Sequence, residues 1–416
     1  MKILSIDVYH YLRGGAETVF LNTSQLLEEH GHSVSRFALK WDENMPSPYS
    51  RYFPESKDTR KGPFRALKNI VTYFYHFEAA RKLDRLLRDE RPDLAHVHLI
   101  WGQLTPSILR VLRRHKVPVV LTAHDYRIVC PAYAFRNGRG EICEKCHGTN
   151  FWHCIGGNCC RGNKPLSAMM AAEQYFRNTF FHPAKMLDGI IYVSDFCRNK
   201  HEQYMPRLRE LPAMRLYNMA MNILPEPAPR AAEPFYLFLG RLSQEKGIET
   251  IIAAFSRMPY LRVKIAGRGP LEAELKKKAE SLGLANVEFL GFKSGAELQQ
   301  LTAEAKALIL PSRCYENNPM TVIEAYSAGT PAIGAEIGGI PEIVVDGMTG
   351  FRFESGDPDS LVEALNKMET LDPEEYGRMQ HAALDFAREN FSLDQYYQRL
   401  IGFYQRVIDA SHPTCH

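Results

Sequence analysis

The sequence predicts an α/β protein made of two doubly wound halves, each a parallel sheet covered by helices. Short apolar runs alternate with longer amphipathic stretches along the whole chain, as repeated strand–helix units do. The 416 residues give room for roughly two to three domains of ~150 residues each. A proline-rich stretch without periodicity, residues 222–234, separates the two series of apolar runs.

Strands are expected over the short apolar runs, with helices between them. In the first half these runs are Ile3–Val8, Ser33–Leu39, Leu94–His98, Val117–Thr122 and Gly189–Val193. In the second half they are Phe235–Leu239, Leu261–Ala266, Val287–Leu290, Ala307–Leu310, Pro331–Ile333 and Gly350–Phe353. The helix expected over Glu17–His30 is followed by Gly31, a typical C-terminal cap.

The predicted domain order follows from these runs. Residues 1–224 form an N-terminal domain with a Cys-rich insert at 130–162, and residues 225–392 form a C-terminal domain, with the boundary near Pro225–Pro234. A last amphipathic helix, within residues 393–416, is expected to pack back on the first domain. Ligands in such folds bind beyond the C-terminal ends of the strands, so the chemistry is expected in strand-to-helix loops.

Composition excludes several classes of protein. Hydrophobic residues at 45% and charged residues at 24% are average for a globular chain, which argues against extended disorder and against an integral membrane protein. A net charge of +3 is too balanced for a surface built to bind nucleic acid. The N-terminus shows no apolar region with a cleavage site, so a cytoplasmic location is expected.

Two loops carry glycine or cations at the start of a helix. Gly14 and Gly15 follow the first strand, where backbone N–H groups can approach an anion; the alternative is a tight turn without a ligand. Arg241 and Lys246 follow the first strand of the second half. Cations at a helix N-terminus are repelled by the helix dipole, and a bound anion would offset that repulsion. We therefore favour a diphosphate-binding role for the two side chains over the alternative that they are only solvated.

A third loop brings two carboxylates to the start of a helix. Pro319 is expected in the first turn of that helix, with Glu316 in the loop before it and Glu324 about a turn and a half inside it. Both side chains can therefore reach one ligand. The N–H groups of residues 317–321 add a further anion site.

Together with the run Gly267-x-Gly269-Pro270 after a strand, these motifs resemble the retaining glycosyltransferases of family four. The resemblance spans essentially the whole chain. It implies the GT-B fold, in which two Rossmann-like domains face a central cleft. It also implies transfer of a sugar from a nucleotide-diphosphate sugar to a glycan or lipid-linked acceptor, with retention of anomeric configuration and no cofactor required for catalysis.

The resemblance assigns roles to the motif residues. Arg241 and Lys246 would hold the diphosphate, Glu324 the ribose hydroxyls and Glu316 the hydroxyls of the donor sugar. The other donor-binding candidates are Gly14, Gly15, Gly267, Arg268, Phe292, Asn318, Pro319, Met320 and Thr321.

Two histidines are candidates on the side of the first domain. The family places a histidine like His124, at the end of a strand, against the donor sugar, and a neutral imidazole suits that role. His98 is a second candidate and shares a strand face with His96. The alternative is that such strand-end histidines are purely structural.

Retention with one sugar-facing carboxylate favours a same-face reaction, in which the leaving phosphate takes the acceptor proton. A covalent double displacement would need a carboxylate under the anomeric carbon, and the sequence places none there.

Six of the nine cysteines fall between residues 130 and 160. The spacing C-x2-C and the crowding favour a structural zinc site, with reduced free thiols or an iron–sulfur cluster as alternatives. The predicted ligands are Cys130, Cys143, Cys146 and Cys159, with Cys154 or Cys160 as substitutes.

The stretch Arg51–Arg91 holds eleven Lys or Arg residues against six Asp or Glu. Its aromatic residues are Phe64, Tyr73, Phe74, Tyr75 and Phe77. This composition is consistent with docking on an anionic membrane surface, and equally with an ordinary helix that has a core face. Membrane docking would fit a lipid-linked acceptor of surface polysaccharide biosynthesis, an inference by family analogy.

Two rival functions stay open at this point. A nucleotide-sugar epimerase or phosphorylase would share the fold, and a catalytically inactive partner protein would share the motifs only as relics.

Overall fold

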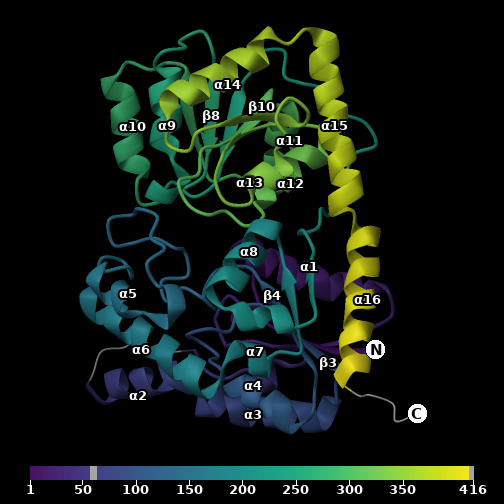
Figure 1. Cartoon of the computed structure of the whole chain (residues 1–416). Helices are drawn as coiled ribbons and strands as arrows, with labels where there is room; N and C mark the ends of the chain where they lie inside the picture. The colour runs from purple at the N-terminus through teal and green to yellow at the C-terminus, as the bar shows by residue number, and fades with distance from the viewer. Residues whose placement is uncertain (57–62, 412–416) are drawn as a thin grey trace. The chain divides into compact units, whose positions relative to one another are not determined.

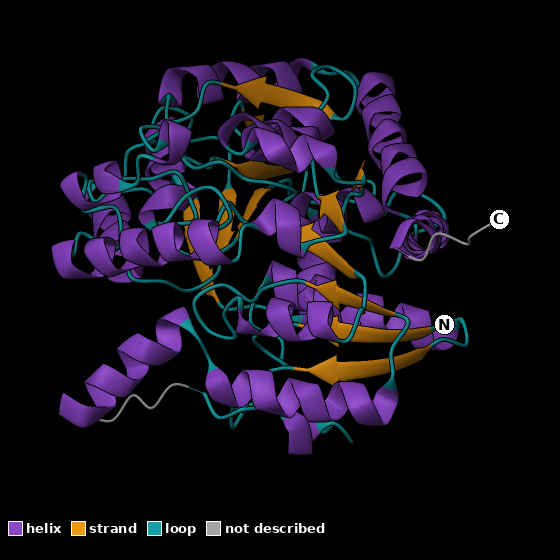
Figure 2. Ribbon diagram, turned by 60° about the horizontal axis from the view of Figure 1, so that its bottom comes forward, coloured by secondary structure: helices purple, strands orange, loops and turns teal. Residues whose placement is uncertain are grey.

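The computed structural model describes residues 1–56 and 63–411, and the side chains of residues 63–68 fall outside the description (Figure 1). Contacts divide the chain into two units. Unit 1 comprises Met1–Leu216 with the residues from Tyr397 onward, and unit 2 comprises Tyr217–Tyr396. In each unit helices enclose a parallel sheet, which confirms the predicted α/β class (Figure 2).

Unit 1 contains a six-stranded parallel sheet in the order β2-β1-β3-β4-β5-β6. The strands are β1 Lys2–Ile6, β2 Ser33–Phe37, β3 Leu94–Val97, β4 Val119–Ala123, β5 Gly189–Tyr192 and β6 Ala213–Arg215. Every residue of β3, β4 and β5 is buried, as expected for parallel strands covered on both faces.

The helices of unit 1 connect these strands. They are α1 Gly15–Glu29, α2 Pro63–Phe74, α3 Phe77–Glu90, α4 Ser107–Arg114, α5 Trp152–Gly156, α6 Lys164–Phe180, α7 Pro183–Met186 and α8 Asp195–Tyr204. Short 3₁₀ turns cover Ser50–Tyr52, His147–Thr149 and Pro206–Glu210. The last helix of the chain is α16, Leu393–Ser411.

Unit 2 contains a second six-stranded parallel sheet in the order β12-β11-β10-β7-β8-β9. Its strands are β7 Tyr236–Leu239, β8 Val263–Ala266, β9 Val287–Gly291, β10 Ala307–Leu310, β11 Ala332–Ala335 and β12 Gly350–Phe353. Its helices are α9 Ile248–Phe255, α10 Glu272–Ser281, α11 Gly295–Glu304, α12 Met320–Ser327, α13 Ile340–Ile343, α14 Pro358–Thr370 and α15 Pro373–Phe391, with a 3₁₀ turn at Gln244–Lys246.

The strand order locates the places where ligands bind in this architecture. In both sheets the chain starts at an inner strand, β1 or β7, builds the sheet out to one edge and then returns to build it out to the other. The order therefore reverses between β1 and β3 in unit 1 and between β7 and β10 in unit 2. Beyond the C-terminal ends of the strands at such a reversal, neighbouring loops turn to opposite faces and leave room for a ligand.

The predicted strands are all present, with ends shifted by a few residues, but one strand has no counterpart in the sequence prediction. The edge strand β6 covers only Ala213–Arg215 and pairs with β5 alone. Three residues are too short for a visible apolar period, so only the pairing with its neighbour defines this strand.

The proline-rich stretch is not a free linker, which corrects the expected boundary. It belongs to unit 2 and is bonded to it: the amides of Leu224 and Ala228 donate to the carbonyls of Ser327 and Ala328, at 2.9 and 3.0 Å. Proline prevents regular structure here, but the amides of Leu224, Ala228 and Ala231 donate to carbonyls elsewhere in unit 2.

The C-terminal helix is held on the sheet of unit 1 by a buried polar contact. The hydroxyl of Tyr404 lies 2.6 Å from Nδ1 of His96, and Nε2 of His96 lies 2.7 Å from the hydroxyl of Thr122. All three residues are buried. Close packing at β5 accompanies this contact, since a Cβ on Gly189 would lie 2.8 Å from the side chain of Val407.

We expect Tyr404→Phe to lower the free energy of unfolding by about 2 kcal/mol, because it leaves a ring nitrogen of His96 buried without a partner. Denaturant unfolding of the purified chain measures this loss. Tyr397→Phe is the control, since its hydroxyl contacts His32 only at a half-buried position. Equal losses in the two variants would contradict a special role for the buried contact.

Candidate functional site

The loops after β7 and β10 meet at the strand-order reversal of unit 2 through a partly buried ion pair. Nζ of Lys246 lies 2.6 Å from Oε1 of Glu316, and the hydroxyl of Ser312 donates to the same oxygen at 2.8 Å. The two charged side chains are only 28% and 14% exposed. Lys246 is therefore matched by a carboxylate of the protein itself, whereas the sequence suggested an anionic ligand as its partner.

Pairing outweighs burial in setting the charges of these two groups. Burial by itself would lower the pKa of Lys246, but the attraction of Glu316 raises it above its usual value. Burial would likewise raise the pKa of Glu316, but the charge and the hydrogen bond of Lys246, with the bond from Ser312, lower it. Both groups are consequently charged at neutral pH.

Glycines allow the backbones at this site to come close. Gly247 has φ +68°, and a Cβ there would lie 1.9 Å from the carbonyl oxygen of Pro311. Gly267 has φ +147°, and a Cβ there would lie 1.8 Å from the carbonyl oxygen of Gly240. No side chain fits at either position, so glycine is required for the loops after β7, β8 and β10 to meet.

We expect Gly247→Ala to separate the loops that carry Lys246 and Glu316. The variant should destabilise unit 2 by more than ~3 kcal/mol, because the strain of a positive φ adds to the steric overlap between the new Cβ and the carbonyl of Pro311. Thermal unfolding measures the loss. Gly283→Ala is the matched control, because Gly283 has φ +66° with open space around its Cβ position. The control isolates the cost of the backbone conformation, about 1 kcal/mol. A similar loss in both variants would argue against the close approach.

Several predicted donor-binding side chains are exposed along one edge of the second sheet. Arg241, Arg268 and Phe292 follow β7, β8 and β9 in turn, and all three are exposed. Glu324 is exposed on α12. Within the described residues, the side chains of these two arginines and of Glu324 have no hydrogen-bond or ion-pair partner. Their charges are therefore available to a ligand.

The start of α12 differs in detail from the prediction. Pro319 is the N-cap residue with extended backbone, and the helix begins at Met320 followed by Thr321, so the proline lies one position before the first turn. The side chain of Asn318 is buried and turned inward, where Oδ1 accepts from the amide of Asn218 at 2.7 Å. This pairing spans a hundred residues, and no local pattern signals it.

In unit 1 the loops after β1 and β3 are joined by a carboxylate that the sequence reasoning missed. Asp7 is fully buried and accepts from the amides of Tyr9 at 2.9 Å and Leu99 at 3.3 Å. Burial raises the pKa of Asp7 well above its usual value, against the effect of these bonds. The sequence feature that could have indicated this buried carboxylate is an acidic residue at the end of an otherwise apolar strand. Nearby, Gly14 is the extended N-cap of α1, and Gly15 is its first residue.

His98 and His124 lie together at the ends of β3 and β4. Nδ1 of His98 is 2.9 Å from Nε2 of His124, and the two rings stack with 13° between their planes. Burial lowers the pKa of His124 to about 4 and that of His98 well below its usual value, with nearby His96 adding to the latter. At neutral pH both rings are uncharged, and one donates its N–H to the other.

Within the described residues, Nε2 of His98 is buried without a hydrogen-bond partner. The ring lies edge-on to Phe20 of α1, with 5.5 Å between centroids. An unsatisfied buried nitrogen costs free energy, and such groups in proteins are few and often functional.

The predicted zinc ligands are clustered but not arranged around a common point. Burial, followed by the neighbouring Cys130, Cys159 and Cys143, raises the pKa of Cys146 to about 12. These thiols therefore lie within interaction range of one another. Among the described residues, however, no group of three or more His, Cys, Asp or Glu side chains is placed to hold a metal ion. The zinc site stays a prediction from the spacing.

The remaining cysteines of the insert lie beside this cluster. The Sγ atoms of Cys154 and Cys160 are 3.9 Å apart, and the Cys154 thiol also bonds Cys159, which lowers the pKa of Cys159. All cysteines in the described part of the chain are free thiols.

A buried polar network, also missed from the sequence, holds the loop that leads into the insert. Arg177 of α6 pairs with Glu173 at 3.1 Å and donates to the carbonyl of Arg127 at 2.8 Å. Arg127 in turn donates to the carbonyl of Pro131 at 2.7 Å. Arg177 and Glu173 are fully buried, so the loop depends on α6 for its shape.

Helices of the described residues are too short or too polar to cross a bilayer.

Two family models match the chain, one in each unit. The model for Glycosyltransferase Family 4 matches residues 13–210, and the model for Glycosyl transferases group 1 matches residues 222–385. The chain therefore belongs to the family-four glycosyltransferases.

Curated relatives match the chain over different lengths. A plant sulfoquinovosyl transferase from Arabidopsis thaliana is 32% identical over 33% of this chain and 26% of its own length. An uncharacterized 42.6 kDa protein in the cps region of Klebsiella pneumoniae is 22% identical over 82% of this chain and 87% of its own. Alpha-D-kanosaminyltransferase from Streptomyces kanamyceticus is 25% identical over 54% and 62%. The chain thus spans about a quarter of the plant relative.

Solved structures share the fold over almost the whole chain. Sucrose-phosphate synthase from Thermosynechococcus elongatus has a TM-score of 0.69 at 17% identity, covering 98% of this chain and 99% of its own. Anabaena HepE, in complex with UDP and glucose, has a TM-score of 0.64 at 19% identity, covering 97% and 99%. The protein has the GT-B fold, as the sequence motifs predicted.

Proposed function

We propose that the protein is a retaining glycosyltransferase that moves a sugar from a nucleotide-diphosphate sugar to a glycan or lipid-linked acceptor in surface polysaccharide biosynthesis. The observation that carries this proposal is the charge arrangement where the strand order of unit 2 reverses. There a partly buried Lys246–Glu316 pair lies close in sequence to two exposed, unpaired side chains, Arg241 and Glu324. The solved structure of HepE with UDP and glucose supports a nucleotide donor for a protein of this fold.

Arg241 is the cation best placed to hold the diphosphate. Its guanidinium has no acidic partner within the described residues, whereas the charge of Lys246 is largely offset by Glu316. A planar guanidinium can bind two phosphate oxygens at once. As the bond to the sugar breaks, negative charge grows on the diphosphate, and a cation fixed beside it stabilises the transition state more than the ground state.

Other exposed groups of unit 2 suit the rest of the nucleotide. The unpaired carboxylate of Glu324 can accept hydrogen bonds from two ribose hydroxyls. The exposed ring of Phe292 offers a flat apolar surface to the base, beside the backbone of Gly267 and the side chain of Arg268.

Glu316 is suited to orient the donor sugar and poorly suited to attack it. Lys246 and Ser312 both bond Oε1, and in the described residues no side chain bonds Oε2, which is left for a sugar hydroxyl. An ion-paired carboxylate with a lowered pKa is a weak nucleophile. This arrangement favours the same-face reaction, in which the departing phosphate accepts the proton of the acceptor hydroxyl.

Unit 1 carries another group suited to binding a sugar, the neutral pair His98–His124. A neutral imidazole can exchange hydrogen bonds with a sugar hydroxyl without placing a positive charge near the oxocarbenium-like carbon. The bond between the two rings fixes the orientation of His124.

We expect one nucleoside diphosphate among UDP, GDP and ADP to raise the unfolding temperature. A ligand present at 100 times its Kd adds about 2.7 kcal/mol to stability. Arg241→Ala is expected to abolish most of this shift and to lower turnover of the donor sugar by well over tenfold. Arg110→Ala, an exposed and unpaired arginine of unit 1, is the control and should match the wild type. Turnover within about tenfold of wild type in Arg241→Ala would contradict the assignment.

Product analysis separates the rival functions. Transfer requires an acceptor, whereas an epimerase converts the donor sugar without one and a phosphorylase requires inorganic phosphate. A chain that binds no nucleotide and turns over no donor would be an inactive partner.

We also propose that the thiols of Cys130, Cys143, Cys146 and Cys159 bind a structural zinc ion. The support is the C-x2-C spacing and the clustering of these side chains. Binding would require the thiols to lose their protons and to draw together, and it would then add to the stability of the insert.

Metal analysis of the purified protein is expected to find about one zinc per chain. Cys143→Ser with Cys146→Ser should remove it, while Cys197→Ser, outside the insert, should retain it. A chain free of metal, or one that keeps its metal in the double variant, would contradict the proposed site, and visible absorbance would indicate an iron–sulfur cluster instead.

A further inference from the structure

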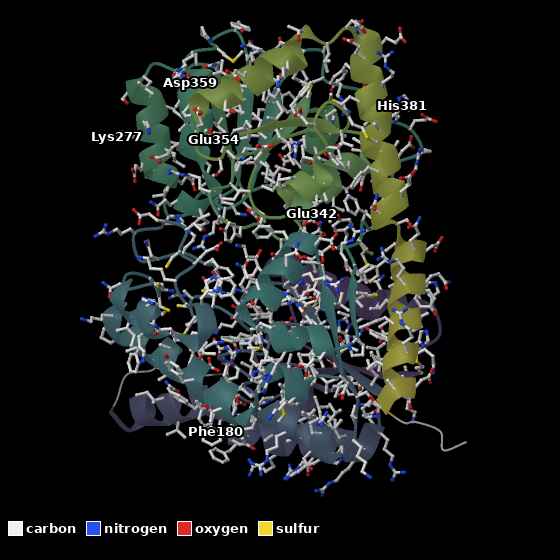
Figure 3. The ribbon with its side chains drawn as sticks, in the orientation of Figure 1. Phe180, Lys277, Glu342, Glu354, Asp359 and His381 are labelled. Atoms are coloured by element: carbon white, nitrogen blue, oxygen red, sulfur yellow. The ribbon has the colours of Figure 1, made fainter. Side chains whose placement is uncertain are left out.

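Large apolar side chains lie exposed where three helices of unit 1 come together. Ile70 and Val71 of α2 are each 48% exposed, Phe77 at the start of α3 is 68% exposed, and Phe180 at the end of α6 is 65% exposed. Figure 3 labels Phe180 at the margin of unit 1. Single exposed apolar residues are common on proteins, but a contiguous set marks an interaction surface.

Ring contacts join the ends of the three helices that carry these side chains. Phe176 of α6 lies 5.5 Å from Phe74 of α2 and 5.1 Å from Phe180, measured between centroids. Tyr75 lies 4.7 Å from Phe77, and Phe181 contacts both Tyr75 and Phe176. Phe74, Tyr75 and Phe176 are half-buried and Phe181 is buried. These rings join the ends of the three helices into an apolar base for the exposed Phe77 and Phe180.

The structure divides the aromatic run that the sequence singled out. The hydroxyl of Tyr73 contacts Arg127 and Met170, and Tyr73, Phe74 and Tyr75 are all partly buried. These three residues therefore pack unit 1 together. Only Phe77 of the described aromatic side chains in this run is exposed, and Phe64 lies outside the described side chains.

Basic side chains continue the surface along α3. Arg81 and Arg85 follow Phe77 by four and eight residues, which places all three on one side of the helix, and both arginines are exposed. Within the described residues neither arginine has an acidic partner. The opposite side of α3 carries the buried Leu83 and Leu87.

We propose that Ile70, Val71, Phe77, Arg81, Arg85 and Phe180, here called the docking face, attach the protein to an anionic membrane surface. Apolar side chains of this kind enter the boundary between headgroups and acyl chains, and guanidinium groups bind the lipid phosphates. Each cation near an anionic leaflet contributes about 1 kcal/mol to attachment. The local excess of Lys and Arg over Asp and Glu across residues 51–91 matches that charge.

Charge also argues against a second copy of the chain as the occupant. A symmetric dimer through the docking face would bring its arginines together with those of the partner, and like charges buried at an interface are costly. A lipid surface supplies the opposite charge. The proposal does not depend on the proposed glycosyl transfer, because binding is measured without donor or acceptor.

Co-sedimentation with lipid vesicles tests the proposal. The wild type is expected to bind phosphatidylglycerol–phosphatidylcholine vesicles, to bind phosphatidylcholine vesicles weakly, and to be released as salt rises. Phe77→Ser with Arg81→Gln should lower the bound fraction at least about fivefold. The matched control is Tyr260→Ser with Lys277→Gln, which removes one exposed aromatic ring and one exposed cation from unit 2; Figure 3 labels Lys277 on α10.

The following results decide whether the docking face binds lipid. A loss in the first double variant with binding retained in the control supports the docking face, provided that both variants unfold at the wild-type temperature. Phe180→Ser, a change on a separate helix, should also weaken binding. Absence of vesicle binding by the wild type, or equal loss in both double variants, would overturn the proposal. A wild-type dimer that Phe77→Ser with Arg81→Gln converts to a monomer, with vesicle binding unchanged, would assign the face to self-association.

Discussion

The close approach of the loops after β7 and β10 is the constraint on which the candidate donor site depends. Because Gly247 has no Cβ, its backbone can contact the carbonyl of Pro311, and the two loops touch there. That contact brings Lys246 and Glu316 into a partly buried ion pair, which neither loop could maintain alone. Removal of either charge would leave the other partly buried without its partner, which is destabilising. The geometry of the site and the stability of unit 2 are therefore linked.

The two units offer opposite electrostatic environments to a ligand. Unit 2 holds a charged pair together with exposed, unpaired Arg241 and Glu324, which suits phosphate and ribose hydroxyls. Unit 1 holds the neutral pair His98–His124 beside the buried Asp7, whose pKa is raised by burial. Water-excluded neutral groups orient hydroxyls by hydrogen bonds, whereas fixed charges stabilise a leaving group.

One helix, α6, organises the periphery of unit 1. Through Arg177 and Glu173 it holds the loop that leads into the Cys-rich insert. At its C-terminal end Phe176 packs against Phe74 of α2, and Phe180 forms part of the docking face. The insert and the docking face therefore share a rigid support. Removal of either charge of the buried Arg177–Glu173 pair would destabilise both the insert and the docking face, because a buried charge without its partner is strongly destabilising.

Sequence patterns alone predict the features of this chain that depend on residues close together along it. Apolar periodicity gave the two series of strands, glycines before helices marked the loops, and the spacing of Glu316 and Glu324 pointed to the edge of the second sheet. Tertiary structure decided the contacts between distant residues. The bond of His96 to Tyr404 joins positions 308 apart, and that of Asn218 to Asn318 joins positions 100 apart. The fold was likewise needed to find the short strand β6, the docking of the proline-rich stretch and the partner of Lys246. A single sequence shows periodicity and turn residues, but it does not show which buried polar groups will pair.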